Sequence, residues 1–216
     1  MILAPSLLSA DAGNYAKEIA EVYALGAQYL HIDVMDAHFV PNLSFGPTLV
    51  AGIRKCSSIL FDVHLMITDP EAYYQAYIDA GADSITVHVE TGCDIARIAK
   101  SCKDQGVLFG IAVKPSTELA SIKQYLSQLD LLLIMSVEPG FGGQKFMPSS
   151  FEKIHAAFEM RDELKANYLI SVDGGVNSSL SNEIIDAGAD ILVAGSAVFN
   201  ANNRKEAIAD LIRRKR

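Results

Sequence analysis

The sequence predicts an α/β protein with the (β/α)8 barrel fold, also called the TIM barrel, in one catalytic domain over residues 1–216. Three observations predict it. The chain has 216 residues, half of them hydrophobic and a fifth charged, which suits one barrel. A glycine followed by a small or acidic residue and then an apolar run recurs along it. Eight such apolar runs alternate with eight amphipathic stretches, at a spacing of about 27 residues, the size of a βα unit.

The recurring pattern marks where helices end and strands begin. It is clearest at 25–34, 80–89 and 187–196, and looser at 105–113. Its glycines fit the left-handed backbone position that closes a helix, because glycine has no Cβ. The β-branched runs that follow are typical of parallel strands buried on both faces. The glycines are Gly26, Gly81, Gly106 and Gly188.

Strands and helices are expected to alternate along the whole chain, with no linker between them. Segments with helical period start at or beside residues that cap helices, such as Asp11, Asp69 (or Thr68), Thr117, Ser149 and Asn177. We expect strands at 3–8, 29–35, 60–66, 84–89, 107–113, 131–137, 169–172 and 191–194. We expect helices at 12–25, 47–55, 70–80, 94–105, 118–127, 150–165, 178–187 and 204–216.

The charge balance excludes some classes of partner. The formal net charge of −8 gives no electrostatic attraction to nucleic acid or to an anionic membrane. A bound phosphate must therefore be held locally, by backbone amides. The basic residues 213–216 are expected to end a solvated helix rather than to bind a polyanion.

Cysteine usage and hydropathy predict a cytoplasmic protein. The three cysteines, Cys56, Cys93 and Cys102, are odd in number and match no zinc motif. The apolar segment 1–11 is too short for a signal peptide and lacks a basic leader. No window holds about 18 uninterrupted apolar residues. We expect reduced thiols and no membrane-spanning segment.

Polar residues gather at the carboxyl ends of the expected strands, where a barrel carries its chemistry. The second strand ends HIDVMD and places His31 and Asp33 on one face; His64 and Asp173 end the third and seventh strands. Two imidazoles and two carboxylates suit zinc, iron(II), cobalt or manganese. A metal-free hydrogen-bonded cluster is the alternative. We favour the metal, because all four residues lie at strand ends.

Other polar and sulfur-containing residues near the same ends have less specific patterns. His88 and Glu90 end the fourth strand; we favour a structural hydrogen-bonding role over contact with the substrate or support of the metal ligands. Asp36 points away from Asp33, and His38 and His155 are expected to be solvated. Three methionines form an apolar lid over the ligand or simply fill the core. They are Met35, Met66 and Met135.

Three glycine-rich loops follow neighbouring strands, at 139–143, 173–175 and 194–196. Glycine allows both the tight turn and the close approach by which backbone N–H groups bind phosphate. In barrels the phosphate commonly lies at the loops after strands seven and eight. Gly174, Gly175, Gly195 and Ser196 fit this position, so we expect a barrel of the phosphate-binding type. Tight βα turns without a ligand are the alternative.

Long blocks of the sequence resemble the ribulose-phosphate 3-epimerase family, in the order in which that family carries them. The match covers nearly the whole chain, and several ordered blocks are more specific than any single spacing. The blocks are LAPSLLSAD (3–11), HIDVMDAHFVPNLSFGP (31–47), DVHLMITDP (62–70), AGADSITVHVE (80–90), MSVEPGFGGQKF (135–146), VDGGV (172–176) and AGSAVF (194–199).

The resemblance implies an isomerase of carbohydrate metabolism, in the pentose phosphate pathway, that interconverts D-ribulose 5-phosphate and D-xylulose 5-phosphate. It implies one divalent metal ion and a homo-oligomer. His31, Asp33, His64 and Asp173 would bind the metal, with Asp33 and Asp173 as the acid/base pair that acts on the C3 proton. The implied substrate-binding residues are Ser6, His64, Gly140, Phe141, Gly142, Gly143, Asp173, Gly174, Gly175, Gly195 and Ser196.

Three residues depart from the family's usual pattern. Ala37 stands where a glycine is usual, and Lys114 and Glu138 stand near the mouth, where they could pair with each other or alter sugar selectivity. The nearest rival is therefore an epimerase of another ketose phosphate, such as D-allulose 6-phosphate. A metal-free phosphoribosyl isomerase or decarboxylase and a non-catalytic sugar-phosphate sensor are the more distant alternatives.

Overall fold

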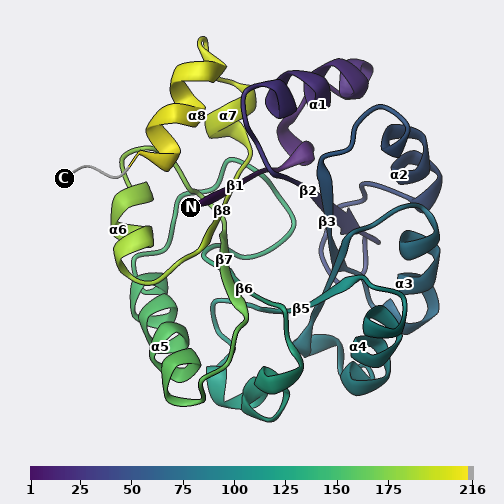
Figure 1. Ribbon diagram of the computed structural model, residues 1–216, viewed down its shortest axis with the longest axis vertical. Helices are drawn as coiled ribbons and strands as arrows, with labels where there is room; N and C mark the ends of the chain where they lie inside the picture. The colour runs from purple at the N-terminus through teal and green to yellow at the C-terminus, as the bar shows by residue number, and fades with distance from the viewer. Residues whose placement is uncertain (214–216) are drawn as a thin grey trace.

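Eight parallel strands form a nearly closed barrel in the computed structural model, which describes residues 1–213. The sheet runs in the order β1-β8-β7-β6-β5-β4-β3-β2, and helices surround it (Figure 1). The predicted (β/α)8 fold is confirmed. The strands are β1 (Ile2–Pro5), β2 (Tyr29–Met35), β3 (Leu60–Met66), β4 (Ser84–His88), β5 (Leu108–Val113), β6 (Leu131–Met135), β7 (Leu169–Asp173) and β8 (Ile191–Ala194).

Helices connect successive strands, and two more, α7 and α8, follow the last strand. The α-helices are α1 (Tyr15–Ala24), α2 (Pro47–Arg54), α3 (Pro70–Asp79), α4 (Ile95–Asp104), α5 (Ser150–Glu163), α6 (Ser181–Asp186), α7 (Ser196–Phe199) and α8 (Arg204–Ile212). The 3-10 helices are η1 (Leu7–Ser9), η2 (Ala12–Asn14), η3 (Val89–Thr91) and η4 (Leu119–Gln128). Within residues 1–213, none of them combines the length and apolarity needed to span a bilayer.

Three expected elements differ from the structure in kind or extent. The helix expected at 118–127 is the 3-10 helix η4, and Thr117, its expected cap, donates its hydroxyl to Glu90 instead. The strand expected at 3–8 ends at Pro5, because the chain turns into η1. The expected helix 204–216 ends at Ile212, and the last three residues of the basic segment 213–216 lie outside the described part of the chain.

The predicted helix-closing glycines all have positive φ, between 71° at Gly106 and 118° at Gly188. Of the two cap candidates before α3, Asp69 is the cap, since its carboxylate accepts the Ala72 N–H. Asp11 likewise accepts the Gly13 N–H at the start of η2. These local interactions set where each connection turns back toward the sheet.

The barrel interior has an apolar part and a polar part. Ala4, Leu133, Ile191 and Val193 belong to a buried cluster contributed mainly by β1, β5, β6 and β8. Fully buried polar groups extend instead across β2, β3 and β4, where the register places Asp33 beside His64 and His64 beside Thr86. Such groups are costly inside a protein unless they are paired or bind a ligand. This part of the barrel is therefore where a site is expected.

Strands β1 and β2 close the barrel by a single bridge, Ser6 to His31, rather than by a ladder. Outside it, the first and last α-helices are also joined: α7 lies between α8 and α1 (Figure 1), and the Arg204 guanidinium donates to Glu18 and Glu21 of α1. Ser6 is thus placed at the seam of the barrel, next to the polar part of its interior.

Candidate metal centre and substrate pocket

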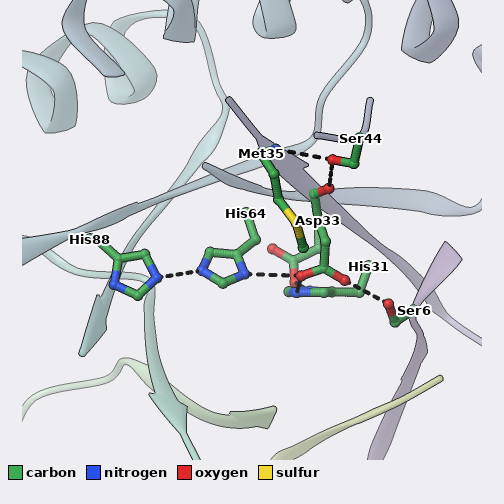
Figure 2. A network of polar contacts seen from close by, with 8 residues as sticks. Ser6, His31, Asp33, Met35, Ser44, His64 and His88 are labelled. Carbon is green, nitrogen blue, oxygen red and sulfur yellow. Dashed lines mark hydrogen bonds and ion pairs between the residues drawn. The ribbon is translucent and has the colours of Figure 1, made fainter. Parts of the chain in front are cut away.

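The structure brings together the four residues predicted to bind a metal. One ligand atom from each of His31, Asp33, His64 and Asp173 can be chosen so that all lie within 4.8 Å of one another. The residues come from β2, β3 and β7, whose carboxyl ends meet at one end of the barrel. Figure 2 shows His88, His64 and Asp33 joined in a line, with Ser6 reaching Asp33 from the other side.

The donor atoms are arranged as a divalent metal requires. Asp33 Oδ1 lies 3.3 Å from His31 Nε2 and 3.2 Å from His64 Nδ1. Two ligands of a tetrahedral metal with bonds of about 2.0–2.1 Å lie about 3.3 Å apart, so these distances fit. His31 Nε2 is fully buried and has no hydrogen-bond partner among residues 1–213. A metal would satisfy that nitrogen, and the donor set of two imidazoles and two carboxylates suits one.

Two serines hold Asp33 in place. Ser6 Oγ donates to Asp33 Oδ2 at 2.6 Å, which leaves Oδ1 to face the imidazoles. Ser44 Oγ donates to the Asp33 carbonyl and accepts the Met35 N–H at 3.0 Å. Ser6 therefore fixes the carboxylate from across the barrel seam, and Ser44 fixes the backbone that carries it.

Each imidazole of the site also has a partner on its outer nitrogen. His31 Nδ1 lies 2.7 Å from Asp62 Oδ2, and Asp62 is only 1% exposed. His64 Nε2 lies 2.9 Å from His88 Nε2, and His88 Nδ1 lies 2.8 Å from Glu90 Oε2. Partners of this kind orient metal-binding histidines and fix which nitrogen carries the proton.

The buried groups shift each other's pKa values. Burial alone would lower the pKa of His31, but the Asp33 and Asp62 carboxylates raise it well above its usual range. Burial would raise the pKa of Asp33, but His31 and His64 bring it below its usual range. Burial, and then repulsion from Asp33, raises the pKa of Asp173 to about 7. The pKa values of the two carboxyl groups are therefore shifted in opposite directions.

A cavity of about 360 Å³ opens above this centre. Asp33 and Asp173 line it, whereas the fully buried His31 and His64 lie outside its lining. The predicted substrate contacts that line it are Ser6, Gly140, Phe141, Gly142, Gly143, Gly174, Gly175, Gly195 and Ser196. Met35, Met66 and Met135 also line it and are almost fully buried, so they form an apolar part of its wall.

Close backbone approach explains two of the glycines. A methyl group on Gly175, which has φ +66°, would lie 2.2 Å from the Phe146 nitrogen. On Gly195 it would lie 2.5 Å from Ser9 Oγ. Neither position has room for a side chain, so the glycine loops pack tightly where they line the cavity. Backbone N–H groups at such a wall suit an anionic group.

The three departures from the family pattern have separate outcomes. Ala37 does adopt positive φ, 61°, the conformation that favours glycine, and its N–H donates to the Asn42 carbonyl at 2.8 Å. Lys114 Nζ lies 4.0 Å from the centre of the Phe39 ring, and no ion pair joins it to Glu138 within residues 1–213. Pairing, one of the two possibilities for Lys114 and Glu138, is therefore not seen among the described residues, and Glu138 is exposed.

The remaining polar predictions can also be placed. His38 and His155 are exposed, as expected. Asp36 points away from the centre and accepts the N–H groups of His38, Phe39 and Thr68. It holds the loop after β2 rather than taking part in the cluster.

Sequence reasoning missed several contributors. Asp62 shares a strand face with His64, but nothing in the spacing indicated that its partner is His31 on the neighbouring strand. Ser9 and Asn200 line the cavity, and Asn42 donates to the Gly140 carbonyl at 2.7 Å. Their positions depend on how loops pack over the barrel mouth, for which a single sequence carries no periodic signal.

Known proteins resemble this chain over almost its full length. The ribulose-phosphate 3 epimerase family model matches residues 2–199. The ribulose-phosphate 3-epimerase of Bacillus subtilis is 46% identical over 210 residues, which is 97% of each chain. That of Synechocystis sp. is 44% identical over 218 residues, covering all of this chain and 95% of the relative.

Solved structures of other proteins share the fold at low identity. The 3-hexulose-6-phosphate synthase of Salmonella typhimurium superposes with a TM-score of 0.73 at 18% identity, over 98% of this chain and 96% of the other. The 3-keto-L-gulonate-6-phosphate decarboxylase of Vibrio cholerae gives a TM-score of 0.72 at 18% identity, over 98% and 94%. At this identity the likeness shows the barrel alone.

Proposed function

We propose, because this chain belongs to the ribulose-phosphate 3-epimerase family, that it interconverts D-ribulose 5-phosphate and D-xylulose 5-phosphate. The observation that carries the proposal is the convergence of His31, Asp33, His64 and Asp173 beneath a cavity walled by glycine loops. The reaction inverts one carbon, C3, next to a carbonyl group. It requires a proton acceptor, a proton donor and stabilisation of the negative charge that develops when the proton leaves.

Asp33 and Asp173 are the proposed acid/base pair. Both line the cavity, and they come from β2 and β7, which are separated by β1 and β8 around the closed barrel. Inversion requires that a proton leaves one face of the planar intermediate and returns to the other face. Two carboxyl groups on different walls can serve the two faces, and exchanging their roles runs the reaction in reverse.

One divalent cation is proposed at the centre, held by His31, Asp33, His64 and Asp173. The mixed nitrogen and oxygen donors suit zinc, iron(II), cobalt or manganese. When bound, the cation supplies Lewis-acid stabilisation of the charge on the substrate oxygens. Ser6 keeps Oδ2 of Asp33 occupied, so Oδ1 remains directed at the two imidazoles.

The cavity wall supports a phosphate-bearing substrate. We place the phosphate against the backbone of Gly174, Gly175, Gly195 and Ser196, and the sugar between Asp33, Asp173 and the loop 140–143. Ser6 and His64 are proposed as further substrate contacts, although His64 is fully buried in this structure. The three methionines give the cavity an apolar wall that contacts the substrate and excludes water.

The test follows exchange of the C3 proton with solvent deuterium. Asp33→Asn and Asp173→Asn should each abolish epimerisation, whereas the neighbouring Asp36→Asn, whose side chain points away from the cavity, should retain it. Persistent epimerisation in both site variants would exclude their assigned roles. A kcat/KM higher for D-allulose 6-phosphate than for the pentulose would overturn the proposed substrate.

We also propose a cytoplasmic location and a homo-oligomer that binds no nucleic acid. The location is supported by three free cysteines and by bacterial relatives. Multi-angle light scattering of the purified enzyme would measure its oligomeric state, and a single subunit mass would refute the homo-oligomer.

A further inference from the structure

We propose that Glu90 and His88 are positioning residues that fix the proton of His64 on Nε2, so that Nδ1 is free to bind the cation. The inference rests on the metal site of the proposed function and deepens it. It assigns to His88 and Glu90 the support of a metal ligand, in place of the structural hydrogen-bonding role that we favoured from the sequence. Neither residue lines the cavity, so neither is proposed to touch the substrate.

The two residues form a continuous chain to the metal centre. His64 Nε2 and His88 Nε2 are 2.9 Å apart, and His88 Nδ1 is 2.8 Å from Glu90 Oε2. Both imidazoles are fully buried. Figure 2 shows the His88 ring in line with His64 and, beyond it, Asp33. On the other side of His64, Nδ1 faces Asp33 Oδ1 at 3.2 Å.

The hydrogen-bond donors around Glu90 determine the direction of this chain. Its Oε1 atom accepts the Lys114 N–H at 2.7 Å and the Thr117 hydroxyl. An ionised carboxylate can only accept, so His88 Nδ1 must carry a proton toward Oε2. Neutral His88 then has a lone pair on Nε2 and accepts a proton from His64 Nε2. A neutral imidazole has one N–H, so His64 Nδ1 is left with its lone pair.

Glu90 is itself held rigidly. The Lys153 ammonium donates to the carbonyls of Lys114, at 3.0 Å, Pro115, at 2.6 Å, and Thr117, at 2.8 Å. This contact fixes the segment 114–117, which supplies both donors to Glu90 Oε1. Hydrogen bonds from Lys114, Thr117 and His88 prevent the Glu90 carboxylate from rotating. Glu90 therefore determines where the proton of His88 lies, and His88 in turn determines where the proton of His64 lies.

The two imidazole ligands are supported in different ways. Asp62 contacts His31 directly and leaves Nε2 toward the centre, whereas Glu90 acts on His64 through His88 and leaves Nδ1 toward it. His64 therefore depends on a chain of two residues, Glu90 and His88. The chain reaches His64 at Nε2, the ring nitrogen opposite the one that faces the centre. Breaking the chain should change metal binding without removing any ligand.

The first test reads the protons directly in the parent enzyme. Nitrogen-15 NMR of the zinc-loaded, histidine-labelled protein should show His88 neutral and protonated on Nδ1, and His64 protonated on Nε2. Spectra in which His88 carries its proton on Nε2, or on both nitrogens, would overturn the proposal. This measurement needs no substitution, so a variant that fails to fold cannot leave the proposal untested.

The second test uses Glu90→Gln to reverse the direction of the hydrogen bonds from residue 90 to His64. The fixed Lys114 N–H requires an acceptor, so the amide oxygen faces Lys114 and the amide NH2 faces His88. His88 must then accept at Nδ1 and donate from Nε2, which moves the His64 proton to Nδ1. We expect zinc affinity, measured by competition with a chromophoric chelator, to fall about 10–100-fold.

Thr117→Val is the matched control, since it removes a donor from Glu90 but leaves the bond from His88 intact. Its zinc affinity should stay within about twofold of the parent. An unchanged affinity in a folded Glu90→Gln variant, or an equal loss in both variants, would overturn the chain. If the proposed chain is wrong, the parent protein is still an active epimerase that binds metal. If the proposed function is wrong, the parent protein itself has no epimerase activity.

Discussion

Gly175 is predicted to be the glycine at which substitution costs most, and Gly106 provides a matched control. Both have similar positive φ, +66° and +71°. A methyl group on Gly106 would meet nothing within 4 Å, whereas one on Gly175 would lie 2.2 Å from the Phe146 nitrogen and 2.8 Å from the Gln144 carbonyl oxygen. The pair therefore separates backbone strain from steric clash.

The structure allows both costs to be estimated. Left-handed backbone costs an alanine about 1 kcal/mol, which is the whole expected effect of Gly106→Ala. Ordinary contact at Gly175 begins near 3.4 Å, so the backbone of Gln144 and Phe146 must move by about 1 Å. Overpacking of this kind adds about 1–3 kcal/mol, for a total of about 2–4 kcal/mol.

Thermal unfolding and steady-state kinetics measure the two consequences. At this chain length about 1 kcal/mol shifts Tm by roughly 2–4 °C, so we expect about 3 °C for Gly106→Ala and about 9 °C for Gly175→Ala. Because the displaced backbone walls the cavity, KM should rise about tenfold or more for Gly175→Ala alone. Equal Tm losses, or an unchanged KM for Gly175→Ala, would refute the reasoning.

Three further predictions concern stability. Ala37→Gly should raise the free energy of unfolding by about 1 kcal/mol in denaturant titrations, because φ is 61° there; a loss of stability would contradict this. Arg204→Met should lower the free energy of unfolding by about 3 kcal/mol, because it leaves the buried Glu18 carboxylate unpaired. The double variant with Glu18→Gln should recover part of this loss, and no recovery would argue against the Arg204–Glu18 ion pair. Burial would raise the pKa of Asp36, but the Thr68 N–H and other donors lower it to about 2, below its unfolded value of about 3.9. The stabilisation by the ionised Asp36 carboxylate is therefore complete above about pH 4 and is lost as pH falls toward 2. Asp36→Asn should flatten the dependence of the free energy of unfolding on pH between these values. An unchanged slope in the variant would contradict this prediction.

The grouping of polar residues at the strand ends could be predicted from the sequence. Side chains alternate along a strand, and all strands of the barrel run in the same direction. Alternation places His31 and Asp33 on one face, and parallel strands place His64 and Asp173 at the same end of the barrel. The four candidate metal ligands, which are far apart in the chain, do lie together in the structure. The length and kind of the connecting elements were less predictable: the Thr117 hydroxyl, an expected helix cap, is used by Glu90 instead, and η4 replaces the expected α-helix.

The contacts between neighbouring strands were harder to predict. The His31–Asp62 and His64–His88 contacts depend on the register and on rotamers that one sequence does not specify. Lys114 lies over the Phe39 ring rather than beside Glu138, because the loop after β2 folds across the mouth. Such choices follow from tertiary packing, which overrides what local pattern alone favours.

The seam between β1 and β2 has a consequence for how the chain acquires its shape during synthesis. Strand β1 leaves the ribosome first, but its ladder partner β8 begins only at Ile191. For most of translation β1 therefore has Ser6–His31 as its one bridge to the growing sheet. An unpaired strand edge in a nascent chain invites association with other chains. The short length of β1 and the early turn into η1 limit that exposed edge until the last strand arrives.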